Sequence, residues 1–259
     1  MCTLSVIPRT NDYLLAMNRD ERIERGAGEL PEIYHRNGTT AVYPSDGAGG
    51  TWIAANEYGI TLALLNWNDI VPLPLGRRKA RSRGEIIPTL ASVASLKVLQ
   101  TEFGALNLEG IQPFRFVGVF PSEQAIAEWG WDSVQLTLQT SGWHSRHWFS
   151  SSLSDRRAKA LRGAACLDAQ HEPDAGSALW LRRLHASHAG GPGPFSLCVH
   201  RDDVKTLSYT EVVVRPGQIQ MGHFRGRPCA MNVDGETGVD RIEYPRATTP
   251  LVGHVCGSD

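Results

Sequence analysis

The sequence predicts a single α+β domain with mostly antiparallel β-sheet and helices packed outside it. Two observations support this fold class. Short apolar runs joined by turn residues come first, helical patterns lie in the middle, and strand-like runs return near the end. The regular alternation of strand and helix that builds a parallel sheet is absent, and so are the glycine-rich nucleotide-binding motifs. A doubly wound nucleotide-binding fold is therefore disfavoured.

Two β-hairpins are predicted in the first 65 residues. Runs at 4–6 and 13–17 flank a turn-rich tetrapeptide, which predicts the first hairpin. Runs at 52–55 and 61–65 flank Asn-Glu-Tyr-Gly, which has good turn chemistry and predicts a second hairpin with largely buried strands. The polar segment 22–45 between the hairpins predicts loops and short strands.

Three helices are predicted in the middle of the chain. Ser82 and Glu85 have the spacing of a capping box, although Pro88 interrupts the pattern that follows. Ser152 and Asp155 predict the start of a second helix that runs to about residue 165, and a third is expected at 178–188. The positions expected to face inward are Ile86, Leu90, Val93 and Ala94 in the first, Leu153, Ala158, Leu161 and Ala165 in the second, and Leu181, Leu184 and His188 in the third.

Further strands are predicted at 114–120, 125–129, 134–138, 196–199 and 206–214. The segment from about residue 226 is rich in glycine, proline and charge, so we expect a loosely ordered tail. No repeat or linker divides the chain, and residues 1–259 are therefore treated as one domain.

Composition limits the function classes. The formal net charge of −1 gives no field for nucleic acid or a membrane surface. No apolar run approaches the roughly 20 residues of a membrane span, and residues 1–9 do not resemble a signal peptide. The five cysteines are odd in number and no two are spaced Cys-x-x-Cys, which argues against disulfides or a zinc knuckle. We expect a soluble, cytoplasmic protein with reduced thiols.

Cys2 is the first candidate catalytic residue. Initiator methionine is usually removed before a small residue, and the chain would then begin with a thiol beside a free α-amine. The ordinary pKa values of these groups, ~8.5 and ~7.7–8.0, allow proton exchange near neutral pH. One residue can thus serve as nucleophile and base. The alternative is that Cys2 is a small buried apolar residue at a strand edge.

Arg19 and Asp20 are the second and third candidates. If residues 4–7 and 13–17 pair as a hairpin, residue 2 lies across the ladder from residues 18–20. Arg19 would then lower the pKa of the thiol, and Asp20 could hold the α-amine by a charge-assisted hydrogen bond. The alternative is a solvated charge cluster at a strand end.

Asn66 is the fourth candidate. It stands at the end of an apolar strand, where its carboxamide N–H can point into a cleft. Acyl transfer needs such a donor for the developing oxyanion, worth about 3–4 kcal/mol. A plain turn-capping role for Asn66 remains an equal alternative.

These residues carry a resemblance to a known family. The set consists of Met-Cys-Thr at the start, Asn-Arg-Asp-Glu at 18–21, Gly-Gly-Thr-Trp at 49–52, Leu-Asn at 65–66 and Ser-Arg-Gly at 82–84. Together with Ser-Tyr-Thr at 208–210 after His-Arg-Asp at 200–202, it resembles the NRDE family, also called the transport-and-Golgi-organisation protein two family. The resemblance covers most of residues 2–215.

The resemblance implies the N-terminal-nucleophile hydrolase fold, a four-layer αββα sandwich of two mostly antiparallel sheets. The opening is also similar to the choloylglycine hydrolase and penicillin acylase group, which cleaves non-peptide amides with an N-terminal cysteine. That similarity implies Cys2 as nucleophile, Arg19 and Asp20 as its supports, and Asn66 as oxyanion-side donor. It also implies a later asparagine, but the nearest stretch, 149–153, has serines at 150–152. A serine hydroxyl could substitute there. A late arginine of that group has no assigned counterpart.

Other candidate sites have plainer interpretations. His144-x-x-His147 and His185-x-x-His188 have a metal-compatible spacing without a supporting motif, so surface roles are preferred. Cys198 and His200 would share one strand face and could bind haem or copper weakly, but a buried thiol is the plainer account. The basic run 77–83 is typical of a solvated loop; beside the Cys2 cleft it could attract carboxylates or phosphates.

Two functional hypotheses follow. In the first, the protein is a cysteine amidohydrolase that cleaves a small non-peptide amide through Cys2 after removal of Met1, with no metal or organic cofactor. In the second, which the resemblance to the NRDE family implies, the same fold is a non-catalytic binding or trafficking protein for haem or acyl-CoA. The missing later asparagine favours binding, whereas the set Cys2, Arg19 and Asp20 favours catalysis.

Overall fold

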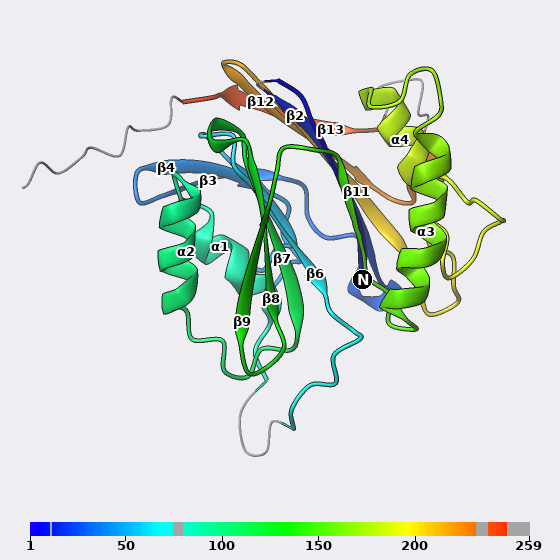
Figure 1. Cartoon of the computed structure of the whole chain (residues 1–259), viewed down its shortest axis with the longest axis horizontal. Helices are drawn as coiled ribbons and strands as arrows, with labels where there is room; N and C mark the ends of the chain where they lie inside the picture. Colours follow the sequence, from blue (N-terminus) through cyan, green and yellow to red (C-terminus); the bar gives the residue numbers. More distant parts are fainter. Residues whose placement is uncertain (11, 75–79, 232–237, 248–259) are drawn as a thin grey trace, which may run out of the picture.

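A computed structural model describes residues 1–10, 12–74, 80–231 and 238–247. They form two antiparallel β-sheets that lie face to face, with helices on both outer faces (Figure 1). The α+β class and the four-layer sandwich are thereby confirmed.

The first sheet begins at the N-terminus and carries Cys2. Every strand pair in it is antiparallel. Its spatial order within the described residues is β10 (Arg146–Phe149), β1 (Cys2–Pro8), β2 (Tyr13–Arg22), β11 (Val204–Arg215), β12 (Gln218–Arg225) and β13 (Asp240–Pro245).

The second sheet follows the chain order as a meander. Its strands, again as far as the structure describes them, are β3 (Glu32–Arg36), β4 (Thr39–Tyr43), β5 (Ile53–Asn56), β6 (Thr61–Asn66), β7 (Phe114–Phe120), β8 (Ala125–Trp131) and β9 (Leu136–Ser141).

The helices divide between the two outer faces. The second sheet is covered by α1 (Ile86–Leu90) and α2 (Leu96–Ala105), and the first by α3 (Asp155–Ala169) and α4 (Ala178–Ala186) (Figure 1). Single 3₁₀ turns occur at η1 (Ile23–Arg25), η2 (Arg83–Glu85), η3 (Pro121–Glu123) and η4 (Pro228–Ala230).

Three apolar layers hold the sandwich together, because strand side chains alternate between the two faces of a sheet. In β1, Leu4 and Val6 enter the core between the sheets, whereas Ile7 packs under α3 and α4. In β6, Leu65 faces the central core and Leu64 packs toward α1 and α2. The central strands of both sheets are covered on both faces, which explains why they are apolar along most of their length, whereas the outer strands β3 and β9 are largely exposed.

Both predicted hairpins are confirmed. In the first, β1 pairs with β2 in a register that sets Cys2 directly opposite Arg19. In the second, β5 pairs with β6 through the predicted turn, where Asn56 Oδ1 accepts from the backbone N–H groups of Tyr58 and Ile60.

The predicted helices differ in detail. Ser154, not Ser152, caps α3, because its hydroxyl accepts from the backbone of Arg157. Leu161 is 49% exposed, and the buried face of α3 instead carries Asp155, Ala158, Arg162 and Cys166. Glu85 does not complete a capping box, since Ser82 Oγ accepts from the backbone N–H of Gly84. His188 lies beyond the end of α4, and His185 takes the inward position.

The end of the chain extends the first sheet. Strand β13 pairs with β12, so ordered sheet reaches into the segment for which we expected a loose tail. Residues 232–237 and 248–259 of that segment lie outside the described residues. None of the helices in the described part of the chain combines the length and apolar character needed to cross a membrane.

Candidate active site

A cavity of about 220 Å³ opens where β1 begins, and both sheets contribute to it. All four predicted site residues, Cys2, Arg19, Asp20 and Asn66, line it. The remaining lining residues come from the neighbouring loops and strands: Met1, Glu21, Arg25, Asp46, Thr51, Trp52, Leu64, Arg81, Ser82, Arg83, Gly84 and Gln112.

The backbone of Cys2 is held on both sides. Its nitrogen donates to Ser150 Oγ at 2.8 Å, and the nitrogen of Ser150 donates to the Cys2 carbonyl at 2.9 Å. The nitrogen of Asp20 donates to the Met1 carbonyl at 2.9 Å. The atom that would become the α-amine after loss of Met1 therefore already has a hydroxyl partner.

Cys2 is buried, with 5% of the residue exposed. Burial raises the pKa of the Cys2 thiol above the ordinary value. The chain's terminal amine and Arg19 oppose that effect, while Asp20 and Glu21 add to it. With Met1 in place the thiol is therefore protonated at neutral pH.

Arg19 faces the cavity across the ladder from Cys2. Its Nη1 donates to the Gly26 carbonyl at 2.8 Å, and its guanidinium lies 4.5 Å from the centre of the Trp52 ring. Burial lowers the pKa of this guanidinium, but an arginine keeps its charge. Hydrogen bond and ring contact together fix a cation beside the thiol.

Asp20 is fully buried, and its carboxylate contacts side chains from β11 and from α3. Thr206 Oγ1 donates to its Oδ1 at 2.6 Å, and Arg162 Nη1 lies 3.4 Å from its Oδ2. Burial raises the pKa of the Asp20 carboxyl, and Arg162 opposes that shift. The hydrogen-bond partner of the Cys2 nitrogen is Ser150, so the predicted bond from Asp20 to this nitrogen is not formed while Met1 is attached.

Arg162 is a site residue that sequence reasoning missed. It is 1% exposed on α3, and its Nη1 donates to Thr3 Oγ1 at 2.9 Å besides contacting Asp20. The interpretation of α3 placed the apolar Leu161 inward instead. The available signal was the spacing Ala158, Arg162, Cys166, which follows one helical face.

Asn66 ends β6 opposite Phe114 of β7 and lines the cavity half-buried. The loop that follows is anchored to α3: Asp155 Oδ2 accepts from the Asn68 nitrogen at 2.6 Å, and its Oδ1 accepts from Ser151 at 2.6 Å. This carboxylate joins the Asn66 side of the cavity to the Ser150 side.

Two glycine motifs, Gly-Gly-Thr-Trp at 49–52 and Ser-Arg-Gly at 82–84, contact each other at the cavity wall. The nitrogen of Thr51 donates to the Gly84 carbonyl at 3.0 Å, and a Cβ added to Gly50 would lie 3.1 Å from the Gly84 Cα. Arg83, next to this contact, lines the cavity. Its Nη1 donates to the Pro113 carbonyl at 3.0 Å, which holds the side chain in place. Arg81 and Arg83 of the predicted basic run therefore line the Cys2 cavity, while residues 77–79 lie outside the described residues.

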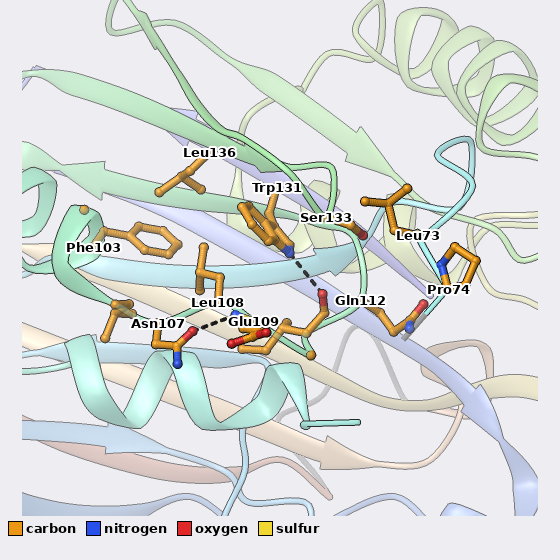
Figure 2. Close-up of a pocket in the computed structure, with 14 residues that line it drawn as sticks. Leu73, Pro74, Phe103, Asn107, Leu108, Glu109, Gln112, Trp131, Ser133 and Leu136 are labelled. Carbon is orange, nitrogen blue, oxygen red and sulfur yellow. Dashed lines mark hydrogen bonds between the residues drawn. The ribbon is translucent and has the colours of Figure 1, made fainter. Parts of the chain in front are cut away.

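A second cavity of about 640 Å³ adjoins the first, since Gln112 lines both. Figure 2 shows the rings of Phe103 and Trp131 and the side chains of Leu108 and Leu136 on its walls. The Trp131 indole N–H donates to the Ile111 carbonyl at 3.0 Å, which fixes this ring. A compartment with both apolar and polar walls thus lies beside the cavity of Cys2, since Asn107, Glu109 and Ser133 also line it.

The histidine candidates separate into two groups. His185 is fully buried with its ring nitrogens near Asn18 Oδ1 and Ser5 Oγ, and His147 Nδ1 lies 2.8 Å from the same serine hydroxyl. These are interior polar contacts. His188, by contrast, lies beside Cys198 and His200.

Comparison with known proteins agrees with this architecture. The family model described as Transport and Golgi organisation 2 matches residues 1–175. The structure is similar to that of penicillin V acylase from Agrobacterium tumefaciens, with a TM-score of 0.51, 13% sequence identity, and coverage of 93% of this chain and 90% of that chain. A variant of conjugated bile acid hydrolase from Clostridium perfringens has a TM-score of 0.48 and 10% identity, covering 98% of this chain and 100% of that chain. No curated protein matches significantly. The N-terminal-nucleophile hydrolase fold implied by the sequence is confirmed.

Proposed function

This chain belongs to the Transport and Golgi organisation 2 family, and we propose that it is a cysteine amidohydrolase that cleaves a small non-peptide amide. One observation carries the proposal. The thiol and the backbone nitrogen of Cys2 stand together at a cavity, with Ser150 on the nitrogen and Arg19 across the ladder.

Removal of Met1 is the activating step of this proposal. Met1 lines the cavity, and its sulfur lies 2.7 Å from the backbone nitrogen of Ser152, so the residue covers the Cys2 end of the site. Its loss would open the cavity and turn the Cys2 nitrogen into a free amine. The bond from this nitrogen to Ser150 Oγ supports a defined position for the amine.

The chemistry then uses Cys2 alone as nucleophile and base. The thiol proton passes to the α-amine as sulfur forms a bond to the amide carbonyl carbon. The tetrahedral intermediate collapses, the C–N bond breaks, and the leaving amine takes the proton from the α-ammonium. Water, deprotonated by the α-amine, then hydrolyses the acyl-thioester and restores the thiol.

The surrounding side chains suit these steps. Arg19 supplies fixed positive charge that favours the thiolate, because its guanidinium is held by Gly26 and Trp52. Asn66 lines the same cavity and is assigned the donor role toward the oxyanion, together with backbone N–H groups. Asp20 is assigned a positioning role through its contacts with Thr206 and Arg162.

The two adjoining cavities support a substrate with one polar and one apolar part. Four arginines and three carboxylates line the Cys2 cavity, so it suits a polar amide group: Arg19, Arg25, Arg81, Arg83, Asp20, Glu21 and Asp46. The neighbouring cavity with Phe103 and Trp131 suits an acyl chain or ring. We therefore assign the substrate as an amide with an apolar acyl group.

The proposal is tested with an electrophilic acyl probe on protein whose N-terminal residue has been determined. Protein that begins at Cys2 is expected to acquire one acyl group on Cys2, and protein that retains Met1 is expected to react far more slowly. Cys2→Ala should abolish labelling and turnover of a linear acyl-amide panel, with the fold retained by circular dichroism.

Cys166→Ser is the matched control, since Cys166 is a buried cysteine on α3 outside the cavity. This variant should label like the parent protein. Labelling of Cys166 or Cys198 with Cys2 unmodified would overturn the nucleophile assignment.

The aromatic and aliphatic side of the second cavity also supports the second candidate function, in which haem or an acyl-CoA is bound without turnover. Ligand-dependent thermal stabilisation, or a haem Soret shift, that survives Cys2→Ala would favour binding. Stabilisation without any labelling of Cys2 would favour binding over catalysis, whereas turnover that depends on Cys2 would favour catalysis.

A further inference from the structure

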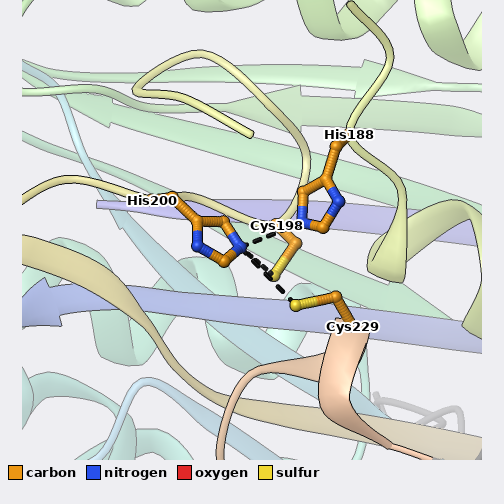
Figure 3. Close-up of side chains that lie close together, drawn as sticks. All are labelled: His188, Cys198, His200 and Cys229. Carbon is orange, nitrogen blue, oxygen red and sulfur yellow. Dashed lines mark hydrogen bonds between the residues drawn. The ribbon is translucent and has the colours of Figure 1, made fainter. Parts of the chain in front are cut away.

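Two histidines and two cysteines converge on one point outside the Cys2 cavity. His188 follows α4, Cys198 and His200 lie before β11, and Cys229 lies in η4 (Figure 3). Their side chains turn toward one another from three separate segments. The sequence shows no metal-binding motif here, since the four residues are dispersed over more than 40 positions and only the fold assembles them.

The distances fit a tetrahedral ion. His200 Nε2 lies 2.9 Å from His188 Nε2, 3.5 Å from Cys229 Sγ and 3.8 Å from Cys198 Sγ. One donor atom from each residue lies within 4.8 Å of all the others. Zinc bonds of about 2.3 Å to sulfur and 2.0–2.1 Å to nitrogen place the four donors of a tetrahedral site roughly 3.3–3.8 Å apart. Small side-chain adjustments would therefore enclose an ion.

We propose that His188, Cys198, His200 and Cys229 bind one zinc-type metal ion in tetrahedral geometry. Two thiolates and two neutral imidazoles are a donor set that zinc prefers. The two thiolates would also balance the charge of a divalent ion, which suits a site where Cys198 is fully buried. Arg227 Nη1 lies 3.4 Å from the outer nitrogen of His200, and this exposed side chain would turn away when that nitrogen carries a proton.

The ion is assigned a structural role, because all four coordination positions come from the protein. It would tie the irregular segment 187–200 to the η4 turn. Val199, between two ligands, exchanges hydrogen bonds with Thr206: its nitrogen donates to Thr206 Oγ1 at 2.8 Å, and its carbonyl accepts from the Thr206 nitrogen at 3.1 Å. Thr206 Oγ1 in turn donates to Asp20. The ion would thus stabilise the backbone that positions Asp20.

Cobalt is the probe for this proposal. The metal-free, reduced full-length protein is titrated with Co²⁺, and we expect one equivalent to bind with the visible bands of tetrahedral Co²⁺ and a thiolate-to-cobalt charge-transfer band. Zn²⁺ should displace the cobalt and raise the midpoint of thermal unfolding. Cys229→Ser, at a half-buried position, should weaken binding by at least about tenfold and reduce the charge-transfer band.

Cys166→Ser again serves as control and should retain the full spectrum. The proposal is overturned if the reduced parent protein gives no thiolate-to-cobalt band. It is equally overturned if the band persists undiminished in both Cys198→Ser and Cys229→Ser. The parent titration keeps the test decisive should Cys198→Ser fail to fold. Activity of Cys2 does not enter these readouts, so the two proposals stand or fall separately.

Discussion

The Ser150 hydroxyl is the side chain that contacts the nitrogen of Cys2. It occupies the stretch where the resemblance to the penicillin acylase group implied an asparagine. A hydroxyl that accepts from an amine favours the protonated amine and holds it in place. Ser150 is therefore a positioning residue for the base of the proposed reaction.

We expect Ser150→Ala to slow acylation of Cys2 about ten- to a hundredfold, the value of a hydrogen bond to a charged group. The pKa of the α-amine should fall, so the rate profile should move to lower pH. The measurement is the acylation rate by mass spectrometry across a pH series. Ser152→Ala changes an exposed neighbour and should leave the profile in place; an identical shift in both variants would contradict the assignment.

Arg162 and Asp20 form a buried ion pair beside the site. We expect Arg162→Met to lower the free energy of unfolding by about 3–5 kcal/mol, because it leaves the Asp20 carboxyl buried without its cation. Urea denaturation at neutral pH measures the loss. Arg156→Met on the exposed face of α3 is the matched control and should change stability by less than about 0.5 kcal/mol.

A double variant separates pairing from packing. Adding Asp20→Asn to Arg162→Met removes the unpaired charge, so part of the lost stability should return. If the two losses simply add, the pair contributes no coupling and the interpretation of Arg162 is wrong.

Among the elements, the two hairpins were predictable because their strand patterns and turns are local in sequence. Because β1 pairs with β2 in the expected way, the position of Arg19 opposite Cys2 could also be predicted. Strand β10 escaped prediction because it is short and partly polar, and β13 because glycine, proline and charge surround it. Ser150 and Arg162 lie 148 and 142 positions from their partners, so no local pattern could reveal these contacts, although the spacing of Ala158, Arg162 and Cys166 indicates that Arg162 faces inward.

The contact between the motifs at 49–52 and 82–84 requires two loop backbones to approach closely at Gly50 and Gly84. We expect Gly50→Ala to cost about 1–3 kcal/mol, because its Cβ would lie 2.9 Å from the Asp46 carboxylate and 3.1 Å from the Gly84 Cα. Acylation of Cys2 should slow as well, since Arg83 moves with this loop. Thermal unfolding and probe labelling measure the two effects.

Gly104→Ala is the matched control for this substitution. Gly104 is exposed in α2 and a Cβ there meets nothing within 4 Å, so alanine should stabilise the helix by about 0.5–1 kcal/mol. Opposite signs at the two glycines are expected. Equal, small effects would contradict the tight contact at Gly50.

At the scale of the whole molecule, the sandwich joins segments that the chain keeps apart. The Cys2 cavity takes Cys2, Arg19 and Asp20 from the first sheet and Asn66 from the second, so its shape depends on how the two sheets meet. Buried polar groups help to set that arrangement. His185 links α4 to β1 and β2 through Ser5 and Asn18, and His223 lies on β12 beside Thr210.

These two histidines predict how the sandwich responds to acid. Burial lowers the pKa of His185 to about 3 and that of His223 to about 4, below the ordinary value of about 6.5. Between these values the unfolded chain binds more protons than the folded one, so stability is full above pH 6.5 and is lost as the pH falls. Each imidazole contributes a slope of about 1.4 kcal/mol per pH unit.

Urea denaturation from pH 7 to pH 4.5 measures this slope. His223→Gln removes one titrating imidazole, so the slope of unfolding free energy against pH should decrease by about 1.4 kcal/mol per pH unit. His144→Gln changes an exposed histidine and should leave the slope as it is. If the free energy of unfolding stays constant or rises on acidification, the rings of His185 and His223 are solvated. The buried position of His223 on β12 would then be wrong.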